Sequence, residues 1–148
     1  HENDRRAGTE NLAARAGLVE AIERLVTTPD FEKSRLELLN SRLSSLDEID
    51  GINLLCPSAK RLANTASFTV PGIDSITQLA ALDLDGICAS AGSACSAGSL
   101  NPSHVLSAMG KSDNEANSLV RFSLGRETTE EEINFVFSSF HNFIEANR

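Results

Sequence analysis

The stretch over residues 89–99 constrains this chain most strongly, because every residue in it is Ala, Ser or Gly except Cys95. Such small side chains bury almost no apolar surface, and Gly92 and Gly98 open backbone conformations that other residues avoid. The stretch therefore cannot form a core. We expect a flexible loop that carries one reactive thiol, since loops on a rigid scaffold often carry function. Composition alone equally permits a Gly/Ser linker that holds a cysteine by chance.

Length and charge exclude several classes of protein. The 148 residues are the size of one ordinary domain, and 41% apolar residues suffice for a core that Leu, Ile, Val and Ala must mostly fill. A net charge of −8 opposes binding to nucleic acid or to anionic lipid, so we expect neither partner. No apolar run approaches the roughly 18 residues of a membrane span, and the start lacks the apolar segment of a secretory signal. The sequence therefore predicts a soluble protein.

The other cysteines predict structure rather than chemistry. Cys56, Cys88 and Cys95 are an odd set without CxxC spacing, which argues against a disulfide framework and against a structural zinc site. A reducing compartment fits, and we expect the cytoplasm. Cys56 is expected in a buried strand and Cys88 in the core. His104 is expected to be a packing or surface residue rather than a base.

Helical periodicity dominates the first third of the chain. An apolar face predicts a helix over residues 11–27, and Thr28-Pro29 is a typical start for a second helix. The apolar stripe expected on that second helix comprises Leu36, Leu39, Leu43 and Leu46. The charged residues expected on its solvated face are Glu32, Lys33, Arg35 and Glu37.

In the middle of the chain the hydrophobic pattern changes from a helical spacing to one typical of short strands. Residues 52–56 and 66–70 read as short strands, with a turn at Pro71-Gly72. A helix should follow and end near Gly86, and Ile87 with Cys88 should enter another strand. A short helix is expected to open at residues 101–103.

The last third gives the clearest pattern. Apolar residues alternate with polar ones over residues 120–124, which predicts a strand with Arg121 on the face away from the core. Thr128 with Glu131, or Thr129 with Glu132, forms a capping box for a closing amphipathic helix. We therefore predict a compact α+β domain, with helices packed on one face of a small antiparallel sheet.

Three motifs carry a resemblance to a known family. RRAGTEN at residues 5–11, SAGSACSAGSLNPSHVLSAMG at 90–110 and VRFSLGRETTEEEI at 120–133 stand in the order found in cysteine desulfurases of the NifS/IscS type. The chain resembles these proteins over nearly its whole length, and departs from them at Ala63 and Ala91. The resemblance implies a pyridoxal-phosphate enzyme of the class V aminotransferase fold (fold type I), a homodimer when full-length. Residues 1–148 would be its C-terminal small domain, with 1–27 leading in from a large domain that this chain lacks.

The resemblance also implies roles for three residues. Cys95 matches the nucleophile that takes sulfur from L-cysteine as a persulfide, leaving alanine, and passes it to an iron–sulfur scaffold or a tRNA-modifying sulfurtransferase. Within eight residues of Cys95 there is no Lys, Arg or His to activate the thiol. Arg121 matches the arginine that binds the substrate carboxylate; an exposed surface ion pair is the alternative. Thr9 matches the threonine that reaches the cofactor phosphate of the neighbouring subunit; a simple helix cap is the alternative.

Other classes of function stay open on sequence alone. Lys33, Lys60 and Lys111 match no motif for the lysine that binds the cofactor, so we expect this chain alone not to turn over cysteine. A selenocysteine lyase or a class V aminotransferase would share the arginine and the threonine without needing the thiol. A non-enzymatic interaction domain that bears a thiol is the third possibility.

Overall fold

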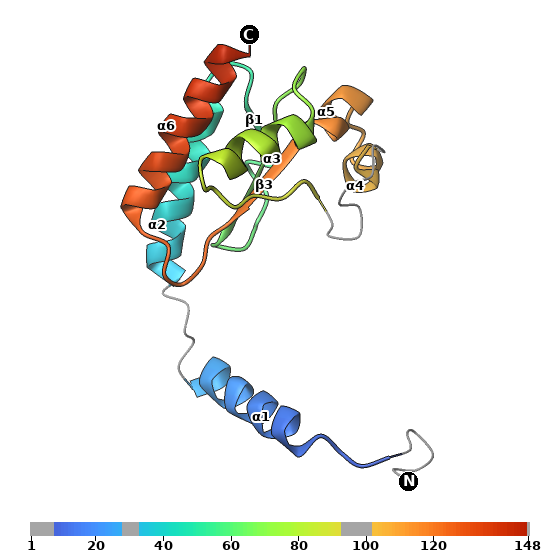
Figure 1. Ribbon diagram of the computed structural model, residues 1–148, viewed down its shortest axis with the longest axis vertical. Coiled ribbons are helices and arrows are strands. Elements are labelled where there is room, and N and C mark those ends of the chain that lie inside the picture. The colour runs from blue at the N-terminus through green and yellow to red at the C-terminus, as the bar shows by residue number, and fades with distance from the viewer. Residues whose placement is uncertain (1–7, 28–32, 93–101, 148) are drawn as a thin grey trace. The chain divides into compact units, whose positions relative to one another are not determined.

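The computed structural model describes residues 8–27, 33–92 and 102–147, with side chains omitted at 25–27 (Figure 1). The chain divides into two units, residues 1–32 and 33–148. The first contains helix α1 (Leu12–Thr27). Asn11 begins it, because the Asn11 Oδ1 atom accepts a hydrogen bond of 3.0 Å from the Ala14 N–H. The apolar side chains predicted for one face are present, and those described are exposed: Leu12, Leu18, Val19 and Ile22.

The second unit is a three-stranded antiparallel sheet with helices around it, in the strand order β1-β2-β3 (Figure 1). Its elements are α2 (Lys33–Ser44), the 3-10 helix η2 (Ser45–Glu48), β1 (Asn53–Leu54), β2 (Thr65–Thr69), α3 (Ser75–Leu84), α4 (His104–Ala108), α5 (Asp113–Asn117), β3 (Leu119–Ser123) and α6 (Glu130–Ala146). In the β2–β3 register, Ser67 lies opposite Arg121. The predicted α+β class is confirmed.

The main core lies between one face of the sheet and α2, α3 and α6. Ala66 and Phe68 of β2 and Val120 and Phe122 of β3 are buried there, as strand alternation requires. The Phe122 and Phe140 rings meet edge to face, with centroids 5.9 Å apart. The predicted leucine stripe is buried, with its last member, Leu46, in η2 rather than in α2.

The opposite face of the sheet is covered at one end, which the sequence did not predict. Leu119 shares this face with Arg121, since successive strand residues alternate. Leu119 packs with Leu106 of α4 and Ala116 of α5 in a second, smaller apolar cluster. Helices therefore lie on both faces of the sheet, and the prediction of a single covered face holds only for α2, α3 and α6.

The predictions for Cys56 and Cys88 are wrong. Both cysteines are exposed. β1 ends at Leu54, and Cys56 turns out of the sheet with a φ of 51°. Residues 87–88 form no strand; Ile87 is buried, and Cys88, the next residue along an extended segment, is exposed.

One charged residue of α2 also differs from its prediction. The Arg35 guanidinium donates 2.6 Å to the carbonyl oxygen of Thr128 and also donates to that of Arg126. Arg35 thus ties α2 to the turn before α6 rather than only facing water. Lys33 and Glu37 are exposed as expected. Glu32 and the predicted start at Thr28-Pro29 lie outside the described residues.

Capping boxes begin two helices of this unit. Of the two alternatives for α6, the structure uses Thr129 with Glu132, and both reciprocal hydrogen bonds are present. The Thr128 hydroxyl oxygen instead accepts a bond from the Gly125 N–H at 2.9 Å. Ser112 and Glu115 form the same arrangement at α5.

The capping box of α5 leads to a prediction about how the stability of the fold depends on pH. Hydrogen bonds from the Lys111 ammonium, 2.8 Å away, and from Ser112 lower the pKa of Glu115 from 4.5 to about 2. A lowered pKa means that the ionised carboxylate stabilises the fold at all pH values above 4.5, and that this contribution is lost as the pH falls through about 2. A carboxyl NMR titration should give that midpoint for Glu115. Lys111→Met should raise it, and Lys33→Met, which removes a lysine paired with Glu37, should leave it unchanged.

Candidate functional site

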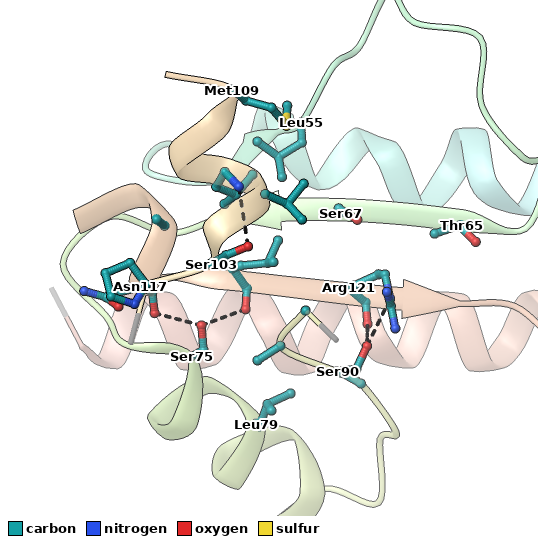
Figure 2. Close-up of a pocket in the computed structure, with 18 of the residues that line it drawn as sticks. Leu55, Thr65, Ser67, Ser75, Leu79, Ser90, Ser103, Met109, Asn117 and Arg121 are labelled. Atoms are coloured by element: carbon teal, nitrogen blue, oxygen red, sulfur yellow. Dashed lines mark hydrogen bonds between the residues drawn. The ribbon is translucent and has the colours of Figure 1, made fainter. Parts of the chain in front are cut away.

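Arg121 lies in the middle of β3 on the sheet face away from the main core, as predicted (Figure 2). On the side of β3 away from β2, its backbone pairs with Ser90. The Arg121 N–H donates to the Ser90 carbonyl oxygen at 2.7 Å, and the Ser90 N–H donates to the Arg121 carbonyl oxygen at 3.0 Å. Ser90 therefore extends the sheet by a single paired residue.

The Arg121 side chain is half-buried and held at one point. Its Nε–H donates to the Ser90 Oγ atom at 3.1 Å, and the Ser90 hydroxyl lies 3.4 Å from the Arg121 carbonyl oxygen (Figure 2). Within residues 8–27, 33–92 and 102–147, no carboxylate forms an ion pair with Arg121. The surface ion pair considered above is therefore not formed among these residues.

Arg121 lines an open cavity of about 1660 Å³. β2 contributes Thr65 and Ser67, α3 contributes Leu79, and Met109 lies at the cavity directly after the end of α4 (Figure 2). The cavity lining thus combines apolar side chains with polar ones, Arg121 among them.

Two serines that line the cavity begin helices, and one of them also bonds to the neighbouring strand. The Ser75 hydroxyl at the start of α3 lies 2.7 Å from the Asn117 carbonyl oxygen and 2.8 Å from that of Leu119 (Figure 2). The Ser103 Oγ atom accepts a bond from the Leu106 N–H and so caps α4. The Ser75 contacts thus fix the start of α3 against the beginning of β3, whereas the Ser103 contact lies within α4.

Cys95 lies outside the described residues, but both ends of its segment are described. Ala91 and Gly92 before it and Pro102 and Ser103 after it line the same cavity as Arg121. On one side the chain is fixed by the Ser90 pairing, and on the other by the bond from the Ser103 N–H to the Ala116 carbonyl oxygen at 3.3 Å. The segment that holds Cys95 therefore leaves the described structure at this cavity and returns to it there.

Thr9 belongs to the first unit, where it is exposed just before α1. Because Asn11 caps α1, the simple helix-cap alternative for Thr9 is wrong. Thr9 and Arg121 lie in different units of the chain.

The other candidate residues and site types that the sequence raised give little indication of function. His104 is exposed at the start of α4, as expected for a surface residue. No cluster of three or more His, Cys, Asp or Glu residues that could hold a metal ion occurs in the part of the chain that the structure describes. Nor does that part contain a helix long and apolar enough to cross a membrane. Sequence reasoning missed Ser90 as a partner of Arg121, because the two residues are 31 positions apart and only the fold brings them together.

The comparisons with known proteins agree with the resemblance. The family described as Aminotransferase class-V matches residues 1–136, and the chain belongs to this family. The cysteine desulfurase IscS of Dictyoglomus turgidum is 39% identical over 149 residues, covering 99% of this chain and 38% of that protein. The cysteine desulfurase NifS of Azotobacter vinelandii is 42% identical over 142 residues, covering 91% of this chain and 34% of that protein.

A solved structure shows the same fold. The NifS-like protein of Rickettsia africae superposes with a TM-score of 0.81 at 30% identity, covering 95% of this chain and 36% of that one. The chain therefore spans little more than a third of the length of the relatives it matches.

Proposed function

We propose that this chain supplies the sulfur-accepting cysteine and the substrate-binding arginine of a cysteine desulfurase, which converts L-cysteine to L-alanine. One observation carries the proposal: the segment that holds Cys95 begins and ends at the cavity that Arg121 lines. We infer from the position of these two ends that a thiol on the segment can reach a substrate bound at Arg121. The names of the curated relatives support the same activity.

Arg121 would bind the substrate carboxylate. A guanidinium offers two parallel N–H donors that match a carboxylate, and a strand provides a rigid mount for them. The Nε–H is taken by Ser90, which leaves the edge formed by Nη1 and Nη2 for the ligand. Cysteine would thus be oriented with its sulfur toward the chain segment that must accept it.

Cys95 would then attack the substrate sulfur as a thiolate. An S–S bond forms on Cys95, the carbon–sulfur bond of the substrate breaks, and its electron pair stays on the carbon, which takes up a proton to give alanine. Bound pyridoxal phosphate supplies the electron sink that makes this cleavage possible. The bound sulfur would then pass to an acceptor protein, which we propose to be an iron–sulfur scaffold or a sulfurtransferase.

The chemistry at Thr9 fits the phosphate of that cofactor. A hydroxyl placed just before the first turn of α1, beside N–H groups without helical partners, is suited to bind an anion. Lys33 and Lys111 form surface ion pairs with glutamates. Neither of these two fits as the lysine that binds the cofactor, and Lys60, which lines the cavity, stands in no motif for that lysine. The fit to the cofactor is therefore argued for its phosphate only.

The rest of the proposal concerns the whole enzyme. We place residues 1–148 in the C-terminal small domain, with 1–27 leading in from the large domain, in a cytoplasmic homodimer. Thr9 would face the cofactor of the neighbouring subunit, as the resemblance to the desulfurases implies.

The proposal is tested by comparing the full-length enzyme with the isolated chain. Each would be incubated with pyridoxal phosphate and L-cysteine, and alanine and sulfide would be measured. The full-length enzyme should form alanine at a steady rate, and the isolated chain should form none. Steady turnover by the isolated chain, or none by the full-length enzyme, would contradict the proposal.

A further inference from the structure

Ser90 contacts Arg121 through both its backbone and its side chain. Two backbone hydrogen bonds, of 2.7 and 3.0 Å, hold the main chains together, and the Oγ atom accepts from Nε at 3.1 Å. The same hydroxyl lies 3.4 Å from the Arg121 carbonyl oxygen, to which it can donate its proton. The oxygen therefore has its proton directed toward the backbone and a lone pair directed toward the guanidinium.

This arrangement selects one orientation of a side chain that otherwise turns about several bonds. With Nε held, the plane of the guanidinium is fixed relative to β3, and one edge, formed by Nη1 and Nη2, remains for a planar ligand. Neither Nη atom has a hydrogen-bond partner within the described ranges. The side chain is thus prepared for a carboxylate approaching from the cavity.

We propose that Ser90 is a positioning residue that sets the guanidinium of Arg121 for the substrate carboxylate. The inference rests on the proposed function, because it takes Arg121 as the carboxylate ligand. Ser90 also pairs with the strand two residues before Gly92, where the described chain leaves toward Cys95. One residue thereby fixes both the carboxylate ligand and the base of the segment that carries the thiol.

The test uses a pair of substitutions in the full-length enzyme that differ only in the hydroxyl. Ser90→Thr keeps the hydroxyl, and Ser90→Val has the same branched shape without it, so any strain from the added methyl group is shared. Ser90→Ala removes the hydroxyl without adding bulk. Ser123→Ala is the control, because Ser123 lies on the same strand and the same face as Arg121 and forms no hydrogen bond to it.

Loss of the hydroxyl should raise the KM for L-cysteine about 3- to 10-fold. This is the range expected when one hydrogen bond to a charged side chain is lost and that side chain, rather than the hydroxyl, contacts the substrate. The kcat should change less than about twofold. This is expected for Ser90→Val and Ser90→Ala, while Ser90→Thr and Ser123→Ala should resemble the unaltered enzyme. The inhibition constant of cysteamine, which is cysteine without its carboxylate, should be unchanged in all four variants.

Two further results decide against the inference. If Ser90→Val and Ser90→Ala leave KM unchanged, or if they weaken cysteamine and L-cysteine equally, Ser90 has only a structural role. In an Arg121→Gln background, Ser90→Ala should raise KM less than about twofold further, because the group it positions is gone. If Arg121→Gln alone leaves the KM for L-cysteine unchanged, Arg121 does not bind the substrate carboxylate, and the proposed function of Arg121 is contradicted rather than the role of Ser90.

Discussion

Replacing Cys95 with serine in the full-length enzyme is expected to lower alanine formation from L-cysteine at least about 1,000-fold, the scale seen when a covalent nucleophile is removed. A serine hydroxyl is a far weaker nucleophile toward sulfur and cannot form a persulfide. The structure places both ends of the Cys95 segment at the cavity lined by Arg121. Cys56 and Cys88 line the same cavity, so their substitution tests whether Cys95 alone accepts the sulfur.

Cys56→Ser and Cys88→Ser are the matched controls, because both cysteines are exposed and line the same cavity as Arg121 but lie outside the segment over residues 93–101. Each should retain alanine formation within about twofold, as expected for surface substitutions. If Cys95→Ser still desulfurates cysteine at an ordinary rate, the thiol is not the sulfur acceptor. The enzyme would then belong with the lyases and aminotransferases that share the arginine without needing the cysteine.

Replacing Arg121 with glutamine should lower kcat/KM for L-cysteine about 100-fold, since a buried or half-buried charged pair with two hydrogen bonds contributes about 3 kcal/mol. Arg121→Lys should recover only part of the loss, because an ammonium cannot present two parallel donors to a carboxylate. Measurement of the steady-state constants for both variants tests this directly.

Arg126→Gln provides the control in the same motif. The Arg126 side chain is exposed and pairs with Glu127 at 3.2 Å, so its loss should change kcat/KM less than about twofold. Equal losses at both positions would mean that general positive charge, and not the geometry of Arg121, attracts the substrate.

The sequence predicted what depends on local periodicity. Alternation over residues 120–124 placed Arg121 on the face away from the core, and the TTEE pattern predicted a capping box. Both signals act between residues that are close in the chain. The choice of Thr129 over Thr128 needed the structure, because the Gly125 N–H takes the Thr128 oxygen.

What the sequence missed depends on contacts between distant segments. The Ser90 pairing joins residues 31 positions apart, and the second apolar cluster joins α4, α5 and Leu119. The cysteine predictions failed because β1 has only two residues, so Cys56 lies beyond the strand that was expected to bury it. A strand of two residues is too short for an alternation of polar and apolar residues to predict its position or its buried face.

The persulfide itself gives the most direct measurement of the central claim. The full-length enzyme would be exposed to L-cysteine without an acceptor, its free thiols would be alkylated, and its peptides would be mapped by mass spectrometry. The account predicts one additional sulfur atom on the peptide that contains Cys95. Additional sulfur on the peptides of Cys56 or Cys88, with none at Cys95, would contradict it.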